Sequence, residues 1–250
     1  MKEAGPVVLL TDFGWGVYAG VMKGVILSIC PGVQVVDLTH DVAPQNVREG
    51  AWLLLTNFAW FPKGSIFVAV VDPGVGTERK ALAVKAADYY FLGPDNGLLY
   101  PAAVRAGIAG VIELDPPADA SRTFHGRDVF APAAARLAAG APFSELGRPG
   151  VIAVRLDFHL ADREGEVVTI DRFGNVVTNL PPLPARRSYT VTLAGGRFRA
   201  EIPCFATYAG APEDTLFLVT GSGGTLELSV RNGAAAPRLG VQVGDRITIA

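Results

Sequence analysis

The feature that most constrains the fold is an alternation of short apolar runs with amphipathic segments, which stops near residue 150. Apolar runs rich in β-branched residues predict strands, and apolar residues recurring every three or four positions, such as Val21, Val25 and Ile29, predict helices. The strands are predicted over 7–10, 33–38, 66–71, 81–84 and 89–92, and the helices over 18–29, 47–57 and 131–139. Residues 1–150 are therefore predicted to form an α/β domain with a mainly parallel sheet covered on both faces.

After the turn residues 147–150 the pattern changes to short strands separated by Gly and Pro. Strands are predicted over 167–170, 189–193, 196–202, 215–219, 225–230 and 246–249. Closely spaced strands without intervening helices are typical of a barrel or a sandwich. Residues 151–250 are therefore predicted to form a smaller all-β domain.

Composition excludes several classes of protein. Half of the 250 residues are hydrophobic, which argues against disorder, and the net charge of −2 gives no electrostatic reason to bind nucleic acid. Apolar runs such as residues 51–55 are too short to span a membrane. Cys30 and Cys204 form no short-spaced motif, so we expect a reduced, cytoplasmic protein.

Two short segments carry the residue types of a proton-handling site. Asp72 ends an apolar strand and enters a Gly/Pro turn that also contains Arg79. His125 lies in a polar segment before an Ala-rich helix, and histidine changes protonation near neutral pH. A carboxylate, a guanidinium and an imidazole can together orient and deprotonate a water or a hydroxyl. The alternative is that Asp72 serves only the turn, that Arg79 is a solvated surface charge, and that His125 is structural.

Two further segments have both a structural and a ligand-binding interpretation. Asp12 follows the first strand, where it can cap the next helix or contact ligand hydroxyls. The run from Asp171 to Asn175, which includes Phe173, can form a hairpin turn or recognise a purine and a charged group. For His40, which ends another strand, we expect a structural hydrogen bond.

Motifs for common cofactors are missing from the sequence. No HxH, HExxH or paired-Cys spacing predicts a metal site, and neither GxGxxG nor GxxxxGK[ST] occurs. We therefore expect neither a catalytic metal nor a dinucleotide cofactor.

These motifs together resemble the S-adenosyl-L-methionine hydroxide adenosyltransferase family, which is related to the fluorinase and chlorinase enzymes. The resemblance covers nearly the whole chain and follows the family's order. It rests on eight segments: Thr11-Asp12-Phe13-Gly14, residues 24–31, Val36-Asp37-Leu38-Thr39-His40, Asp72-Pro73-Gly74-Val75-Gly76, residues 93–99, Phe124-His125-Gly126-Arg127-Asp128, Asp171-Arg172-Phe173-Gly174-Asn175 and Gly224-Thr225-Leu226-Glu227.

The resemblance implies a cytoplasmic hydrolase that splits S-adenosyl-L-methionine (SAM) with water into adenosine and methionine, without a cofactor. It implies an N-terminal α/β domain, a C-terminal β-barrel and a homotrimer with sites between subunits. The family's catalytic set falls on Asp72, Arg79 and His125. The family's ribose-binding residue falls on Asp12, and its adenine-pocket residues fall on Phe173 and Asn175, with Phe205 as a stacking aromatic. The contacts to the methionine end fall on Asp171 and Ser222.

There are two alternatives to hydrolysis, one within the same scaffold and one from another class of protein. A halogenase would use chloride or fluoride, but this chain has Asp72 and Val75 where the fluorinase has Tyr and Thr, and a carboxylate repels a halide. A protein that binds SAM or adenosine without chemistry would not need all three catalytic residues. This chain departs from the family at residues 15–18, where its loop is one residue shorter than the family's and lacks the family's acidic residue. We therefore expect one contact to the methionine end to be lost or replaced.

Overall fold

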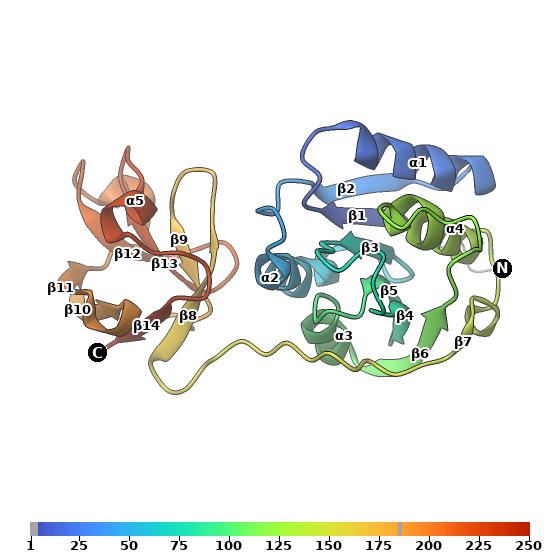
Figure 1. Ribbon diagram of the computed structural model, residues 1–250. Coiled ribbons are helices and arrows are strands. Elements are labelled where there is room, and N and C mark those ends of the chain that lie inside the picture. Colours follow the sequence, from blue (N-terminus) through green and yellow to red (C-terminus); the bar gives the residue numbers. More distant parts are fainter. Residues whose placement is uncertain (1–4, 185–186) are drawn as a thin grey trace. The chain divides into compact units, whose positions relative to one another are not determined.

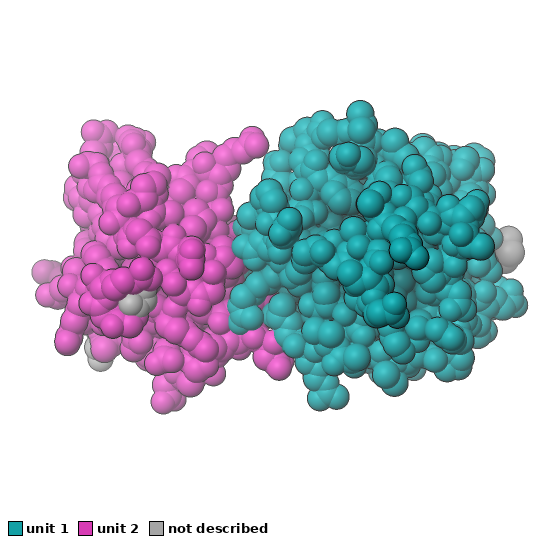
Figure 2. Space-filling model, viewed as in Figure 1, with its two compact units in different colours: residues 1–156 teal, residues 157–250 magenta. Residues whose placement is uncertain are grey.

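The computed structural model describes residues 5–184 and 187–250. The chain divides into two compact units between Leu156 and Asp157, coloured teal and magenta in Figure 2. The change of sequence pattern near residue 150 lies six residues before this division. Each unit has its own sheet, and we describe each unit by itself.

The N-terminal unit is built on a seven-stranded sheet with the order β2-β1-β3-β5-β4-β6-β7. Its strands are β1 (Val7–Thr11), β2 (Val35–Thr39), β3 (Ile66–Val70), β4 (Ala81–Ala86), β5 (Tyr89–Pro94), β6 (Ile108–Leu114) and β7 (Arg148–Pro149). The pairs β1–β2, β1–β3 and β3–β5 are parallel, but β4–β5, β4–β6 and β6–β7 are antiparallel. The predicted mainly parallel sheet is therefore only partly parallel. The reason is local, because only Ala87 and Asp88 join β4 to β5, and so short a connection makes a hairpin.

Helices cover both faces of this sheet (Figure 1). They are α1 (Val17–Ile29), α2 (Val47–Asn57), α3 (Tyr100–Ala106) and α4 (Ala131–Ala138), with short turns at Phe58–Trp60 and Phe143–Glu145 and a π-helical turn at Gly126–Phe130. On one face, α1 and α4 pack on apolar side chains of β1 and β3. On the other face, α2 and α3 pack against each other.

Helix α1 buries a different face from the one that the sequence spacing suggests. Ala19, Met22 and Ile26 are buried, whereas Val21 and Ile29 are exposed. The helix is apolar on nearly all sides, so the spacing of its apolar residues does not identify the buried face. A large apolar surface is left exposed on this helix.

The C-terminal unit contains a second seven-stranded sheet, in the order β11-β10-β14-β8-β9-β13-β12. Its elements are β8 (Glu164–Ile170), β9 (Val176–Thr178), β10 (Ser188–Leu193), β11 (Phe198–Pro203), β12 (Leu216–Thr220), β13 (Leu226–Val230), α5 (Ala235–Leu239), β14 (Arg246–Ile249) and short turns at Ala194–Gly196 and Tyr208–Gly210. Cys204, next to β11, forms an isolated bridge with Leu218 of β12, and the Phe205 amide donates to the Leu218 carbonyl at 3.0 Å. These contacts bring the two edge strands together, so the sheet is nearly barrel-shaped.

Both units hold a buried core of aliphatic and aromatic side chains. Within the described ranges, no helix combines the length and apolarity needed to cross a membrane. Cys30 and Cys204 are both free thiols, one in each unit.

Candidate active site

The candidate active site lies at the carboxyl ends of the parallel strands in the N-terminal unit. Val71 continues β3 as a fully buried residue, and Asp72 follows it. In β1, Thr11 is paired with Val70 of β3, so Asp12 and Asp72 both follow strands that end at the same edge of the sheet. This edge is where open α/β sheets bind their ligands.

Asp72 and Arg79 form a two-point ion pair. Nε of Arg79 donates to Oδ1 of Asp72 at 3.0 Å, and Nη2 donates to Oδ2 at 2.5 Å. Their side chains are 5% and 9% exposed. Water therefore screens this charge-assisted contact poorly, and the planar fork holds the carboxylate in one orientation.

His125 joins this pair through a contact of 2.8 Å between its Nδ1 and Nη2 of Arg79. Arginine only donates hydrogen bonds, so Nδ1 must accept, and the imidazole proton lies on Nε2. Burial, and then the positive charge of Arg79, lower the pKa of His125 below its ordinary value. The residue is therefore neutral at neutral pH and presents an N–H donor at Nε2.

One guanidinium nitrogen of Arg79 makes no hydrogen bond to another described residue. Nη1 is buried and has no hydrogen-bond partner within the described residues. The guanidinium carbon also lies 5.6 Å from the ring centre of Phe130, in the turn that follows His125. The ring supports the guanidinium from one side, and Nη1 remains able to donate to a polar atom.

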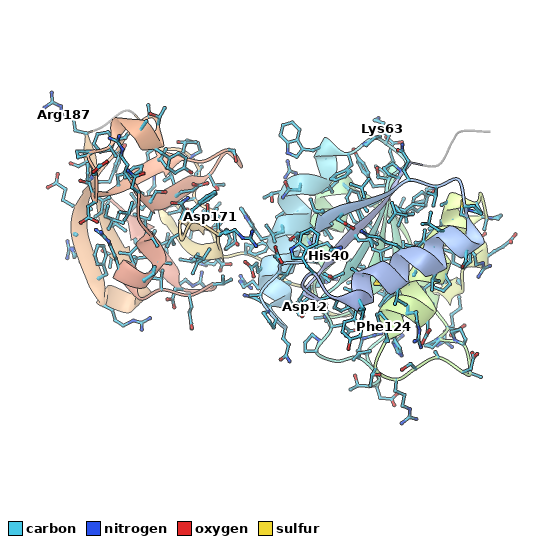
Figure 3. All side chains as sticks on the ribbon, turned by 90° about the horizontal axis from the view of Figure 1, so that it is seen from above. Asp12, His40, Lys63, Phe124, Asp171 and Arg187 are labelled. Atoms are coloured by element: carbon cyan, nitrogen blue, oxygen red, sulfur yellow. The ribbon has the colours of Figure 1, made fainter. Side chains whose placement is uncertain are left out.

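The loop after β1 is held by residues from the end of β2. The Thr11 hydroxyl lies 2.8 Å from Nδ1 of His40, and the Gly14 amide donates to the His40 carbonyl at 2.8 Å. Nε2 of His40 faces Oδ1 of Asp37 at 3.1 Å. Figure 3 shows Asp12 and His40 at this end of the N-terminal unit. The hydrogen bonds confirm the structural role predicted for His40.

Asp12 does not cap the following helix. The N-cap of α1 is Gly16, which makes no side-chain capping bond. The Asp12 carboxylate instead accepts the Gln45 amide at 2.8 Å. The capping interpretation is therefore wrong, and Asp12 is half-buried at the end of β1, the strand that pairs with β3 ahead of Asp72.

Three aromatic rings join the loop after β1 to the segment that carries His125. The rings of Phe13, Tyr18 and Phe124 contact one another edge to face, with centroids 5.3 to 5.9 Å apart. Phe124 directly precedes His125 and is labelled in Figure 3. Edge-to-face contacts of this kind fix the two segments against each other.

In the C-terminal unit, Asp171, Phe173 and Asn175 lie in the turn between β8 and β9. Oδ1 of Asp171 accepts the Phe173 and Asn175 amides, and Oδ2 accepts the Asn175 side-chain amide at 2.8 Å. Asn175 is buried, whereas Phe173 is 77% exposed. The hairpin interpretation is confirmed, and it leaves the Phe173 ring available to a ligand or a partner.

Phe205 and Ser222 lie elsewhere in the same unit. Phe205 lines a cavity of about 270 Å³ together with Leu183, Pro184, Cys204, Ala206, Leu218, Val219, Thr220 and Leu226. The cavity is mostly apolar, which suits a flat aromatic group.

Ser222 is exposed in the turn 221–224, below which Glu227 is buried. Tyr208 donates to Glu227 at 2.5 Å, and burial raises the pKa of that carboxyl.

Asp72, Arg79 and His125 are thus brought into contact, and Asp12 lies at the same sheet edge. The other candidate residues belong to the C-terminal unit. Sequence reasoning missed Phe130 and Asn96, whose side-chain amide donates to the Val71 carbonyl at 2.8 Å. Asn96 lies in the segment 93–99 that the family resemblance uses, but nothing in that segment indicated a hydrogen bond to Val71. No group of three His, Cys, Asp or Glu side chains in the described ranges is arranged to hold a metal ion.

Comparison with known families matches both units of the chain. Residues 7–147 match the SAM hydroxide adenosyltransferase N-terminal domain, and residues 165–248 match the C-terminal domain. An uncharacterized conserved protein from Thermotoga maritima has the same fold, with a TM-score of 0.90, 35% identity and coverage of 98% of this chain and 100% of that one.

Curated relatives include enzymes of two kinds. An (R)-S-adenosyl-L-methionine hydrolase from Thermus thermophilus is 40% identical, over 96% of this chain and 97% of that protein. One from Salinispora arenicola is 39% identical, over 96% of this chain and 95% of its own. A fluorinase from Nocardia brasiliensis is 29% identical, over 76% of this chain and 78% of the fluorinase.

Proposed function

The chain belongs to the SAM hydroxide adenosyltransferase family, and on this basis we propose that it is an enzyme that hydrolyses SAM to adenosine and methionine. The single observation that carries the mechanism is the buried contact of Asp72, Arg79 and His125. In the reaction, a water oxygen attacks C5′ of the adenosyl group, the C5′–sulfur bond breaks, and the sulfonium leaves as the neutral thioether of methionine. One proton is released from the attacking water.

Asp72 accepts that proton in our proposal. His125 is a poor candidate for the base, because its Nδ1 already accepts from Arg79 and its Nε2 carries a proton. The carboxylate of Asp72 keeps lone pairs beyond the two that Arg79 occupies. Arg79 therefore orients the carboxylate, and its unpaired Nη1 is a donor for the water oxygen.

His125 contributes a hydrogen-bond donor and excludes bulk solvent. Its Nε2–H can hold the attacking oxygen in line with the C5′–sulfur bond while Nδ1 stays on Arg79. Because the leaving group is already good, the enzyme's main contribution is the positioning of a poorly solvated water. No metal or organic cofactor takes part in the proposed reaction.

We propose the following substrate contacts. Asp12 binds the ribose hydroxyls, and Phe205, Phe173 and Asn175 bind the adenine. The apolar cavity beside Phe205 supports this assignment. Asp171 and Ser222 bind the amino-acid end of SAM, and the buried acidic group Glu227 beneath the Ser222 turn is consistent with an ammonium ligand.

We further propose that the protein assembles as a homotrimer, with each site shared by the N-terminal domain of one subunit and the C-terminal domain of its neighbour. Large apolar side chains next to Asp12 support an assembly, since Trp15, Val17 and Tyr18 are 76%, 73% and 54% exposed. The free thiols of Cys30 and Cys204 support a reducing, cytoplasmic environment. Light scattering at several protein concentrations tests the trimer.

The activity is tested by incubating the purified protein with SAM in a buffer that contains a metal chelator and no added halide. The products are then separated by chromatography. We expect adenosine and methionine in equal amounts, and we expect Asp72→Asn to form both products far more slowly. SAM binding without any product would overturn the hydrolase. A halogenated nucleoside formed only with chloride or fluoride would identify a halogenase instead, which the Asp72 carboxylate disfavours.

A further inference from the structure

The turn that follows β5 contacts the backbone beside both partners of the Asp72–Arg79 ion pair. The Asp95 amide donates to the carbonyl of Lys80, the residue after Arg79, at 2.9 Å. Nδ2 of Asn96 donates to the carbonyl of Val71, the residue before Asp72, at 2.8 Å. Two consecutive residues therefore connect the backbone segments that carry the ion pair.

The turn itself is held in one conformation. Oδ1 of Asn96 accepts the Leu98 amide at 3.2 Å, so both ends of its side-chain amide are used. Gly97 has φ +96°, a left-handed conformation that favours glycine, and Leu98 is fully buried. The Asn96 side chain is therefore fixed in the orientation in which it donates to the Val71 carbonyl.

Asp95 attaches the same turn to the end of the N-terminal unit. Its carboxylate, 6% exposed, accepts the amides of Ala153 at 3.0 Å and Val154 at 3.2 Å. A buried carboxylate with two backbone donors is a strong anchor. The turn is therefore anchored through Asp95 to the segment that leads out of the unit. Through Asn96 it is hydrogen-bonded to Val71.

We propose that Asn96 is a positioning residue for catalysis, which sets the carboxylate of Asp72 through the Val71 carbonyl without touching the substrate. This inference rests on the proposed hydrolase function. Removing the Nδ2 donor frees the Val71–Asp72 peptide to rotate, and Asp72 then meets the water in a less favourable orientation. A misplacement of about 1 Å lowers turnover by up to about 100-fold.

The test compares Asn96→Asp with a matched control, Asn57→Asp. Asn57 is also half-buried, and its Nδ2 donates to the Leu53 carbonyl at 2.9 Å at the end of α2. Both variants replace an N–H donor to a backbone carbonyl with an oxygen. We expect kcat to fall about 10- to 100-fold in Asn96→Asp, with KM and the Kd of adenosine unchanged within about twofold. The control should keep the wild-type kcat.

Asn96→Ala is the second variant, used if Asn96→Asp fails to fold, and circular dichroism monitors the fold of each protein. The imidazole NMR signals of His125 provide a readout that needs no turnover, because they report the contact with Arg79. We expect them to shift in the Asn96 variants and not in Asn57→Asp. Wild-type kcat and unshifted signals in a folded Asn96 variant would overturn the inference. Absence of product from the wild-type protein would overturn the hydrolase, and the NMR comparison would still decide the positioning role.

Discussion

Nη2 of Arg79 lies 2.8 Å from Nδ1 of His125, and this contact exists only while the imidazole is neutral. A second proton on the ring would have to occupy Nδ1, where the guanidinium already donates. The protonation state of His125 is therefore coupled to the orientation of Arg79, and through Arg79 to the carboxylate of Asp72.

Activity is expected to fall at acidic pH as His125 takes up its second proton. Burial and Arg79 lower the pKa of His125, so kcat/KM should stay constant down to about pH 6.5, the ordinary value, and decline below it. The variant His125→Asn, whose Oδ1 can still accept from Arg79, should move this decline to lower pH. A pH–rate profile of both proteins makes the measurement, and an unchanged acidic limb in the variant would contradict the coupling.

The same shift makes folding stability depend on pH. Because the pKa of His125 is lower in the folded state, the unfolded chain takes up the proton first as the pH falls. The contribution of His125 to the free energy of unfolding is complete above about pH 6.5 and is lost as the pH approaches the folded-state pKa. Urea unfolding at pH 5 to 8 measures the free energy of unfolding of the wild type and of His125→Asn. If the two free energies change with pH in parallel, His125 makes no pH-dependent contribution.

Asp72→Asn should lower turnover strongly and leave substrate binding nearly unchanged. The amide keeps the size of the side chain but cannot accept the proton, so kcat should drop by about 10²- to 10⁴-fold. Calorimetric titration should give a Kd for SAM within a few-fold of the wild type. Asp115→Asn is the control, since Asp115 is an exposed partner of Arg148. Equal losses of kcat in both variants would show that the effect is not specific.

Arg79→Ala should lower both stability and activity. It leaves the Asp72 carboxylate buried without its partner, which costs about 3–5 kcal/mol of unfolding free energy. Arg79→Lys restores a charge but only a single contact point, so it should recover stability better than kcat. Thermal unfolding and steady-state kinetics of the two variants separate these effects.

The position of Ser222 should depend on the glycine before it. A Cβ on Gly221 would collide with the buried carboxylate of Glu227, whereas a Cβ on Gly223 has no neighbour within 4 Å. Gly221→Ala should therefore raise KM for SAM by about tenfold, a loss of about 1.4 kcal/mol in binding. Gly223→Ala should behave as the wild type, and a similar KM in the two variants would remove the turn from the binding site.

The sequence predicted best those elements whose boundaries are marked locally. Helix α2 begins and ends at the predicted residues, and its beginning is marked by Asn46, whose side chain accepts the Glu49 amide. Helix α3 and strand β6 were not predicted, because a single residue, Gly107, separates them and neither has a regular apolar pattern. The buried face of α1 was ambiguous because the helix is apolar nearly all round.

The candidate site was predicted as a set of residue types, not as a geometry. Asp72 and Arg79 share one loop, so their contact could be suspected from the sequence. The contacts of His125 with Arg79, and of Asn96 with Val71, join segments 46 and 25 residues apart. Such contacts depend on the sheet order, which pattern and propensity do not specify. The roles of the C-terminal residues stay predictions.

The spacing of the ion pair also bears on how the site assembles during folding. Asp72 and Arg79 are seven residues apart, whereas Arg79 and His125 are 46 residues apart. By loop-closure entropy, (3/2)RT ln(46/7), the shorter loop costs about 1.7 kcal/mol less to close. During folding, the carboxylate and the guanidinium can therefore pair early, before α4 and the preceding His125 pack on the sheet. The histidine is then added to a pair that already exists, so variants of His125 should slow the formation of the loop between Asp72 and Arg79 less than they slow the completion of the site.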